Sequence, residues 1–63
     1  MPILRDWKIH TYYSKEQQKE VSYLTGKVYD DRKFSNGREI KTLSIIEIGD
    51  DFAKTRNRNY ILE

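Results

Sequence analysis

The sequence predicts an all-β protein, a small five- to six-stranded bent meander or an SH3-like barrel. Two observations favour this fold class. Aromatic and β-branched residues recur at a spacing of two, and tight-turn residues separate five or six such short segments within the 63 residues. A chain of this length forms one domain at most, spanning residues 1–63.

The first predicted strand covers residues 4–13, where one face carries Trp7, Ile9, Thr11 and Tyr13 and the other carries Asp6, Lys8, His10 and Tyr12. The following segment, residues 14–20, is entirely polar. Its Ser14 and Gln17 have the spacing of a capping box, which allows one short helical turn at 14–20. A solvated loop is an equally good interpretation of this segment.

Residues 21–29 form the second predicted strand, with Val21 and Tyr23 on one face and Leu24 and Val28 on the other. Gly26 lies just beyond this change of face and indicates a bulge or a sharp bend. Farther along, Asn36-Gly37 predicts a hairpin turn, because both residue types tolerate positive φ angles. We expect a loop longer than two residues.

Residues 40–48 are apolar at positions of both parities, which is typical of a central strand or of one covered by a second surface. A turn at 49–51 follows, and then two short strands at 52–56 and 59–62 that join near residues 57–58. The longer loop expected at Asn36-Gly37 would let Phe34 and Ile40 share one buried face.

The candidate core is thin for 63 residues. Its members are Trp7, Ile9, Val21, Leu24, Val28, Phe34, Ile40, Ile45, Ile46, Ile48, Phe52, Tyr60 and Leu62. The chain has no cysteine, which excludes disulfides as a source of additional stability. The small core and the segment of residues 40–48, which is apolar on both faces, together predict a homo-oligomer, a dimer or higher.

The charge balance is nearly even, with 12 Lys and Arg against 10 Asp and Glu and a net charge of +2. No block of five or six like charges is present, so the chain has neither a basic arm nor an acidic tail. It also lacks an apolar run that could span a membrane and the apolar stretch of a signal peptide. We therefore expect a cytoplasmic protein that does not engage membranes.

The sequence argues against an enzyme. His10 is its only histidine, and no serine stands in the context of an activated nucleophile. The acidic pairs Asp30-Asp31 and Asp50-Asp51 occupy predicted turns, where Asp bonds to the backbone, so neither these pairs nor Glu47 is assigned to a metal. No catalytic residue, metal ligand or cofactor is predicted.

Basic residues alternate with aromatic residues in two segments, and this is the pattern that points to a ligand. The predicted ligand-binding residues are Lys27, Tyr29, Arg32, Lys54, Arg56, Arg58 and Tyr60. Basic side chains suit phosphates and aromatic rings stack on bases, which indicates a nucleotide signal or a nucleic acid as the partner. The competing interpretation is a solvated face whose lysines and arginines protect an edge strand from aggregation.

Three segments, residues 24–29 (LTGKVY), residues 34–42 (FSNGREIKT) and Thr55-Arg56 with Tyr60-Ile61-Leu62, resemble short uncharacterised β proteins of bacteria and their phages. The resemblance covers roughly residues 24–62 and implies a fold more than an activity. Some phage proteins of this size inhibit host defence by binding a host protein or by sequestering a nucleotide signal. The resemblance implies a phage or prophage protein acting in the host cytoplasm.

A protein–protein inhibitor or adaptor acting on a host protein is the alternative function. The predicted partner-binding residues are then the tyrosines Tyr12, Tyr13 and Tyr23, because tyrosine contributes strongly to interface energies.

Overall fold

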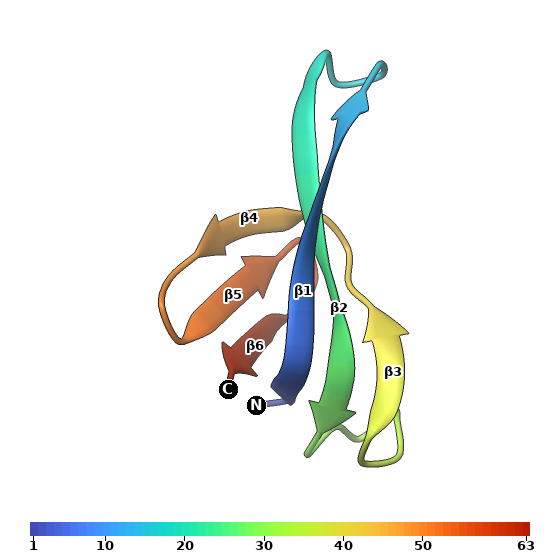
Figure 1. Cartoon of the computed structure of the whole chain (residues 1–63), viewed down its shortest axis with the longest axis vertical. Coiled ribbons are helices and arrows are strands. Elements are labelled where there is room, and N and C mark those ends of the chain that lie inside the picture. The colour runs from blue at the N-terminus through green and yellow to red at the C-terminus, as the bar shows by residue number, and fades with distance from the viewer.

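The computed structural model describes all 63 residues and contains one six-stranded sheet without helices (Figure 1). Its strands are β1 (Ile3–Ser14), β2 (Lys19–Tyr29), β3 (Arg38–Lys41), β4 (Ile45–Ile48), β5 (Phe52–Thr55) and β6 (Asn59–Leu62). Their spatial order is β3-β2-β1-β6-β5-β4. The predicted all-β fold is confirmed. No helix long and apolar enough to cross a bilayer is present.

The sheet consists of two antiparallel three-stranded units joined by a parallel pair. β1 and β6 pair in parallel at Ile3 with Ile61 and at Leu4 with Leu62. Two backbone bonds outside this ladder reinforce the pair, from Ile61 N–H to Pro2 O (2.9 Å) and from Glu63 N–H to Leu4 O (3.0 Å). A simple meander has no parallel neighbours, so this pairing was not predicted.

The two longest strands, β1 and β2, extend beyond the rest of the molecule as a twisted ribbon (Figure 1). We call residues 8–24 of this ribbon the arm. β3 flanks β2 on one side, and β4, β5 and β6 lie on the other side of β1, so the sheet bends around the base of the arm. The sheet is open, because its edge strands β3 and β4 are not hydrogen-bonded to each other.

A β-bulge in β1 lies opposite Gly26, where the sequence predicts a bulge or bend. The register of β1 with β2 shifts between Arg5, which faces Lys27, and Lys8, which faces Thr25. Asp6 within the bulge has a φ angle of 51°. A Cβ atom on Gly26 would lie 3.0 Å from Trp7 Cα and 3.0 Å from Arg5 O, so the close approach of β1 at the bulge favours glycine at this position.

Residues 15–18 form the turn at the tip of the arm, so the loop alternative holds and the helical turn is absent. The spacing of Ser14 and Gln17 has a structural role nevertheless, since Gln17 N–H donates to Ser14 Oγ at 3.3 Å. The polar segment forms no helix because it has no apolar stripe that a helix could bury against the sheet.

The connection from β2 to β3 is the longer loop that the sequence predicts around Asn36-Gly37. Gly37 has a φ angle of 86°, and its N–H donates to Val28 O at 2.8 Å. Phe34 and Ile40 are both partly buried and pack against the core. The expectation that this loop places both side chains on one buried surface is confirmed.

Residues 40–48 do not form the predicted central strand. They divide into β3 and β4 at opposite edges of the sheet, with Thr42 buried between them. The Thr42 hydroxyl accepts a bond from Leu24 N–H (3.0 Å) and donates to Leu43 O (2.9 Å), so this side chain replaces a ladder bond where the chain leaves β2. The two-faced apolar pattern therefore reflects two edge strands.

The core lies beneath β1, β2, β5 and β6. Its buried hydrophobic cluster is Leu4, Leu24, Val28, Ala53 and Leu62, with Trp7, Phe34, Ile40 and Ile45 packed against it. Val21 and Tyr60 are also buried.

Four predicted core residues are wrong, because Ile9, Ile46, Ile48 and Phe52 are exposed. The last three lie in or next to an edge strand, and Ile9 lies in the arm, where no second layer covers them. Leu4 and Ala53 belong to the core although neither residue was predicted there.

Candidate functional site

Alternate side chains of β1, β2 and β3 form one surface, which we call the outer face. It includes Ile3, Arg5, Lys8, His10 and Tyr12 from β1, Val21, Tyr23, Thr25, Lys27 and Tyr29 from β2, and Glu39 and Lys41 from β3. Antiparallel partners in a ladder project from the same side of a sheet, so the registers place these residues together.

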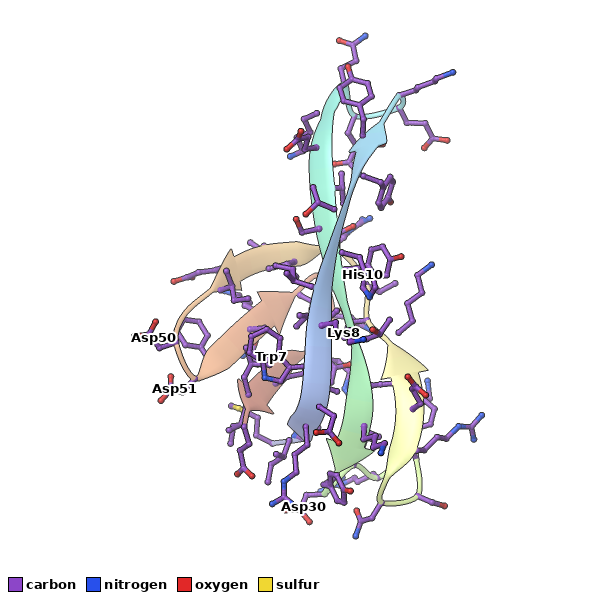
Figure 2. All side chains as sticks on the ribbon, in the orientation of Figure 1. Trp7, Lys8, His10, Asp30, Asp50 and Asp51 are labelled. Atoms are coloured by element: carbon purple, nitrogen blue, oxygen red, sulfur yellow. The ribbon has the colours of Figure 1, made fainter.

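The bulge opposite Gly26 determines which β1 residues reach the outer face. It inserts one extra residue into β1, so the side of the sheet occupied by even-numbered residues changes after Arg5. Figure 2 shows the result: Trp7 points towards β5 and β6, whereas Lys8 and His10 lie on the side of β3. Without the bulge, the register would place Lys8 and His10 on the core side.

Tyr23 is the centre of an aromatic cluster on this face. The His10 ring stacks on it with a centroid separation of 5.0 Å and an interplanar angle of 15°. Tyr12 meets it edge-on at 6.0 Å, and Lys41 Nζ lies 4.6 Å from the Tyr23 ring centroid. His10 Nε2 is also 2.9 Å from Thr25 Oγ1, which holds the imidazole in this orientation. The cluster is a preorganised aromatic surface with a cation over its centre.

Four cations lie on the outer face, and they differ in whether a carboxylate neutralises them. Arg5 pairs with Glu63 at 2.8 Å, and Lys27 pairs with Asp6 at 3.6 Å through exposed side chains. Neither Lys8 nor Lys41 has a carboxylate within 4.0 Å. These two lysines are therefore available to an anionic ligand, and Lys41 borders the aromatic cluster.

A shallow hollow of about 430 Å³ lies next to the cluster. Its lining residues are Tyr12, Tyr23, Lys41, Thr42, Leu43 and Ser44. About half of the surface of Tyr12 is open to solvent, and Leu43 is similarly exposed. The hollow thus offers an apolar rim, an aromatic wall and a free ammonium group within one open depression.

The predicted ligand-binding residues are only partly brought together. Lys27 and Tyr29 lie on the outer face, where the Arg5 guanidinium is 4.7 Å from the Tyr29 ring centroid. Arg32 and Arg58 line a separate hollow of about 320 Å³ together with Asp31 and Lys33.

The remaining predicted ligand residues lie away from the outer face. Tyr60 is buried and cannot stack on a ligand, whereas Lys54 is exposed on β5. The chain reverses after Thr55, and Arg58 O accepts the Thr55 N–H at 2.8 Å. Lys54, Arg56 and Arg58 therefore do not share one extended strand, and the cationic row expected from their spacing does not form.

Arg58 forms an ion pair with the buried carboxylate of Asp31. Its Nη1 lies 2.7 Å from Asp31 Oδ2, and the Asp31 side chain has no exposed surface. Burial alone would raise the pKa of Asp31, but the Arg58 guanidinium beside it and hydrogen bonds from the backbone of Lys33 and Phe34 hold it below its ordinary value. The same contact raises the pKa of Arg58, so this pair anchors the loop after β2 to the turn before β6.

The three predicted partner-binding tyrosines do not form one surface. Tyr12 and Tyr23 belong to the aromatic cluster, whereas Tyr13 faces the other side of the arm, paired with Glu20 in the register. The exposed fractions of Tyr12 and Tyr13 are 51% and 61%. Both side chains are largely exposed and they lie on opposite faces, so they form a matched pair for substitution.

The acidic residues considered as metal ligands are dispersed. Asp30 lies at the end of β2, whereas Asp50 and Asp51 lie at the turn between β4 and β5 (Figure 2). No three His, Cys, Asp or Glu side chains converge in the arrangement of a metal site.

Sequence reasoning missed Arg5, Lys8, His10 and Lys41 as members of the site. Part of the signal was available, because the alternation of Lys8, His10 and Tyr12 already placed these three on one face of the first strand. Their meeting with Tyr23 and Lys41 depends on the β1–β2 and β2–β3 registers, which residue spacing does not specify.

Comparisons with known proteins identified no relative of this chain. No protein-family profile, no curated protein and no solved structure matches the chain. The function of the outer face must therefore be inferred from its own side chains.

Proposed function

We propose that this protein is a non-enzymatic binding module that engages a single-stranded nucleic acid through its outer face. The observation that carries the proposal is the Tyr23 cluster, in which two aromatic rings and the Lys41 ammonium surround one tyrosine. Bases stack on exposed aromatic rings, and phosphates bind cations that no carboxylate neutralises. Tyr12 supplies the open ring, and Lys8 and Lys41 supply the charge.

The openness of the site favours a strand over an isolated nucleotide signal. The outer face follows three neighbouring strands, and its hollow beside Tyr12 is shallow. A small nucleotide on such a surface would keep most of its area in water, whereas tight small-ligand sites enclose their ligand. A single-stranded nucleic acid can contact several of these side chains with successive nucleotides. A mononucleotide that binds as tightly as an oligonucleotide would therefore contradict the proposal of a nucleic-acid ligand.

The first test compares Tyr12→Ala with Tyr13→Ala in the binding of a fluorescently labelled single-stranded oligonucleotide, measured by anisotropy. Tyr12→Ala removes the open stacking ring and should weaken binding by about 1–3 kcal/mol, roughly 5- to 150-fold in Kd. Tyr13→Ala removes a similarly exposed tyrosine from the other side of the arm and should leave Kd unchanged. Equal effects of the two substitutions would refute the assignment.

The same measurement with Lys41→Gln and Lys54→Gln separates a local contact from a net-charge effect. Both substitutions remove one exposed positive charge, but only Lys41 borders the Tyr23 cluster. If Lys8 and Lys41 each neutralise one phosphate, log Kd should change with log salt with a slope of about 1.4, and Lys41→Gln should reduce it to about 0.7. Lys54→Gln should keep the wild-type slope.

A protein partner is the second candidate function, favoured by the projection of the arm beyond the rest of the sheet (Figure 1). An inhibitor or adaptor that grips a host protein around the arm would use Tyr12, Tyr13 and Tyr23 from both faces. Capture of that protein should then depend on Tyr13 as strongly as on Tyr12, and oligonucleotides should neither bind nor compete. The two candidates therefore predict opposite results for Tyr13→Ala.

A further inference from the structure

The arm forms one wall of a cleft of about 880 Å³, and β4 forms the other wall. The arm residues of the cleft come from both faces of the ribbon, because Ile9 faces the core side whereas Val21 pairs with Tyr12. The apolar residues of the cleft are Ile9, Val21, Ile45, Ile46 and Ile48. Ile46 is 62% exposed and Ile9 is 49% exposed. Apolar side chains of this size are rarely grouped on a surface that stays in water, so the cleft has the character of an interface.

Both walls of the cleft also present unpaired strand edges. β2 pairs with β3 only at residues 25–28, β1 pairs with β6 only at residues 3 and 4, and β4 pairs with β5 alone. The arm is therefore a two-stranded ribbon with two free edges, a structure that is marginally stable in water. Free edges bind further extended chain, so the occupant that suits this cleft is itself a β-strand or hairpin.

The charges of the cleft suit the arm of a second copy. The arm wall carries Glu16, Lys19 and Glu20, one net negative charge, and the opposite wall carries Arg56. Arg56 has no carboxylate within 4.0 Å in its own chain. The arm of a second copy would place the partner's Glu16 and Glu20 near Arg56, where opposite charges attract. A polyanion such as a nucleic acid would gain no such attraction, because the charged residues of the cleft sum to zero.

We propose that the chain is a two-fold dimer in which the arm of each copy lies in the cleft of the other. In such a dimer the same surface of each copy both forms the cleft and supplies the arm that fills the cleft of the partner. The interface is therefore closed, and no apolar patch remains exposed to bind a third copy. A standard interface needs about 800 Å² per partner, roughly one sixth of the 4808 Å² surface of this chain. The arm, residues 8–24, makes up more than a quarter of the chain and is long enough to provide it.

The mass in solution tests the proposal. Sedimentation equilibrium of the wild-type chain at high-micromolar concentration should give twice 7.6 kDa, and Ile46→Lys should give 7.6 kDa. Ile46 is mostly exposed in the single chain, so the lysine should leave the circular dichroism spectrum unchanged. Leu43→Lys is the matched control, since Leu43 is 52% exposed and lies outside the cleft, and this variant should remain dimeric.

Disulfide trapping keeps the proposal testable even if Ile46→Lys fails to fold. The chain has no cysteine, so single Gln17→Cys and Ile48→Cys variants, mixed and mildly oxidised, can link only between copies. Both positions line the cleft, and efficient formation of the mixed dimer is the expected result. A wild-type monomer, a dimer that survives Ile46→Lys, or absence of the mixed disulfide would overturn the proposal.

Dimerisation and nucleic-acid binding can be tested separately, because the cleft and the hollow beside Tyr12 share only Ser44 among their lining residues. The monomeric Ile46→Lys variant should bind the labelled oligonucleotide with an affinity per chain within about twofold of the wild type. Loss of dimerisation with binding retained supports both assignments. A dimer that binds no oligonucleotide supports the cleft assignment and refutes the outer face alone.

Discussion

Asp31 illustrates, at the scale of one residue, how a short chain holds a loop without a large core. Its two carboxylate oxygens have different partners, because Oδ1 accepts Lys33 N–H at 2.7 Å and Oδ2 contacts Arg58. The predicted turn role of the Asp30-Asp31 pair is thus combined with an ion pair. The charge of Arg58 is consequently neutralised by Asp31, although its residue type suggested a phosphate contact.

Asp31→Asn should destabilise the protein by about 1–3 kcal/mol at pH 7, because Asn keeps the Oδ1 acceptor but removes the charge facing Arg58. The folded state lowers the pKa of Asp31 from its ordinary value of 3.8, so its stabilisation is present above that pH and is lost as the pH falls through the lower folded value. Urea denaturation should therefore show the wild type approaching the variant below about pH 3.8.

Asp50→Asn is the matched control, since Asp50 lies exposed at another turn, and it should change stability by less than about 0.5 kcal/mol. A stability difference between the wild type and Asp31→Asn that persists unchanged at pH 2 would contradict the ion-pair account.

At the scale of elements, Thr42 separates β3 from β4. Its backbone N–H donates to Leu24 O at 2.8 Å while its hydroxyl accepts the N–H of the same residue, so Thr42 supplies both partners of one ladder position. Because of this contact, the chain can separate from β2 at Thr42 while the buried Leu24 N–H keeps a hydrogen-bond acceptor. The chain then crosses to the far edge of the sheet, where β4 becomes one wall of the cleft.

Thr42→Val preserves the shape of the side chain but leaves Leu24 N–H buried without an acceptor. We expect a loss of about 1–3 kcal/mol, seen as a lower urea midpoint with an unchanged m value. Thr42→Ser retains the hydroxyl and loses one methyl group, so it should cost only about 0.8 kcal/mol. The reverse order of the two variants would show that packing, and not the hydrogen bond, determines the contribution of Thr42.

The whole molecule combines a small core with two proposed interaction surfaces, the outer face and the cleft between the arm and β4. Only Leu4, Leu24 and Val28 are large side chains that are fully buried. A core of this size supplies little stability, so the dimer proposed above should contribute substantially to the folded state.

The thermal midpoint of the wild-type chain should accordingly rise with protein concentration. At about 100 times the dissociation constant, association stabilises the folded state by about 2.7 kcal/mol, and each kcal/mol corresponds to about 4–8 °C for a domain of this size. Ile46→Lys should melt at a midpoint that does not depend on concentration. A wild-type midpoint that is equally insensitive to concentration would argue that the small core suffices alone.

The sequence by itself determined the all-β class, most strand positions, the Asn36-Gly37 loop and the turn at 49–51. It also indicated an irregularity at Gly26, although the bulge lies in β1 opposite this glycine and not in β2. These features depend on backbone preferences and on alternation within a few residues, which a single chain segment expresses locally. Lys27, Tyr29, Tyr12 and Tyr23 were also recognised as candidate site residues from their types and neighbours.

Only the tertiary structure decided which strands lie at the edges, which cations remain unpaired and which aromatic rings meet. Arg58 and Tyr60 were lost from the candidate site to an ion pair and to burial, whereas Lys8, His10 and Lys41 joined it. The physical reason is register: one inserted residue in β1 and the split of segment 40–48 change the neighbours of many side chains, and pairings between distant segments determine both.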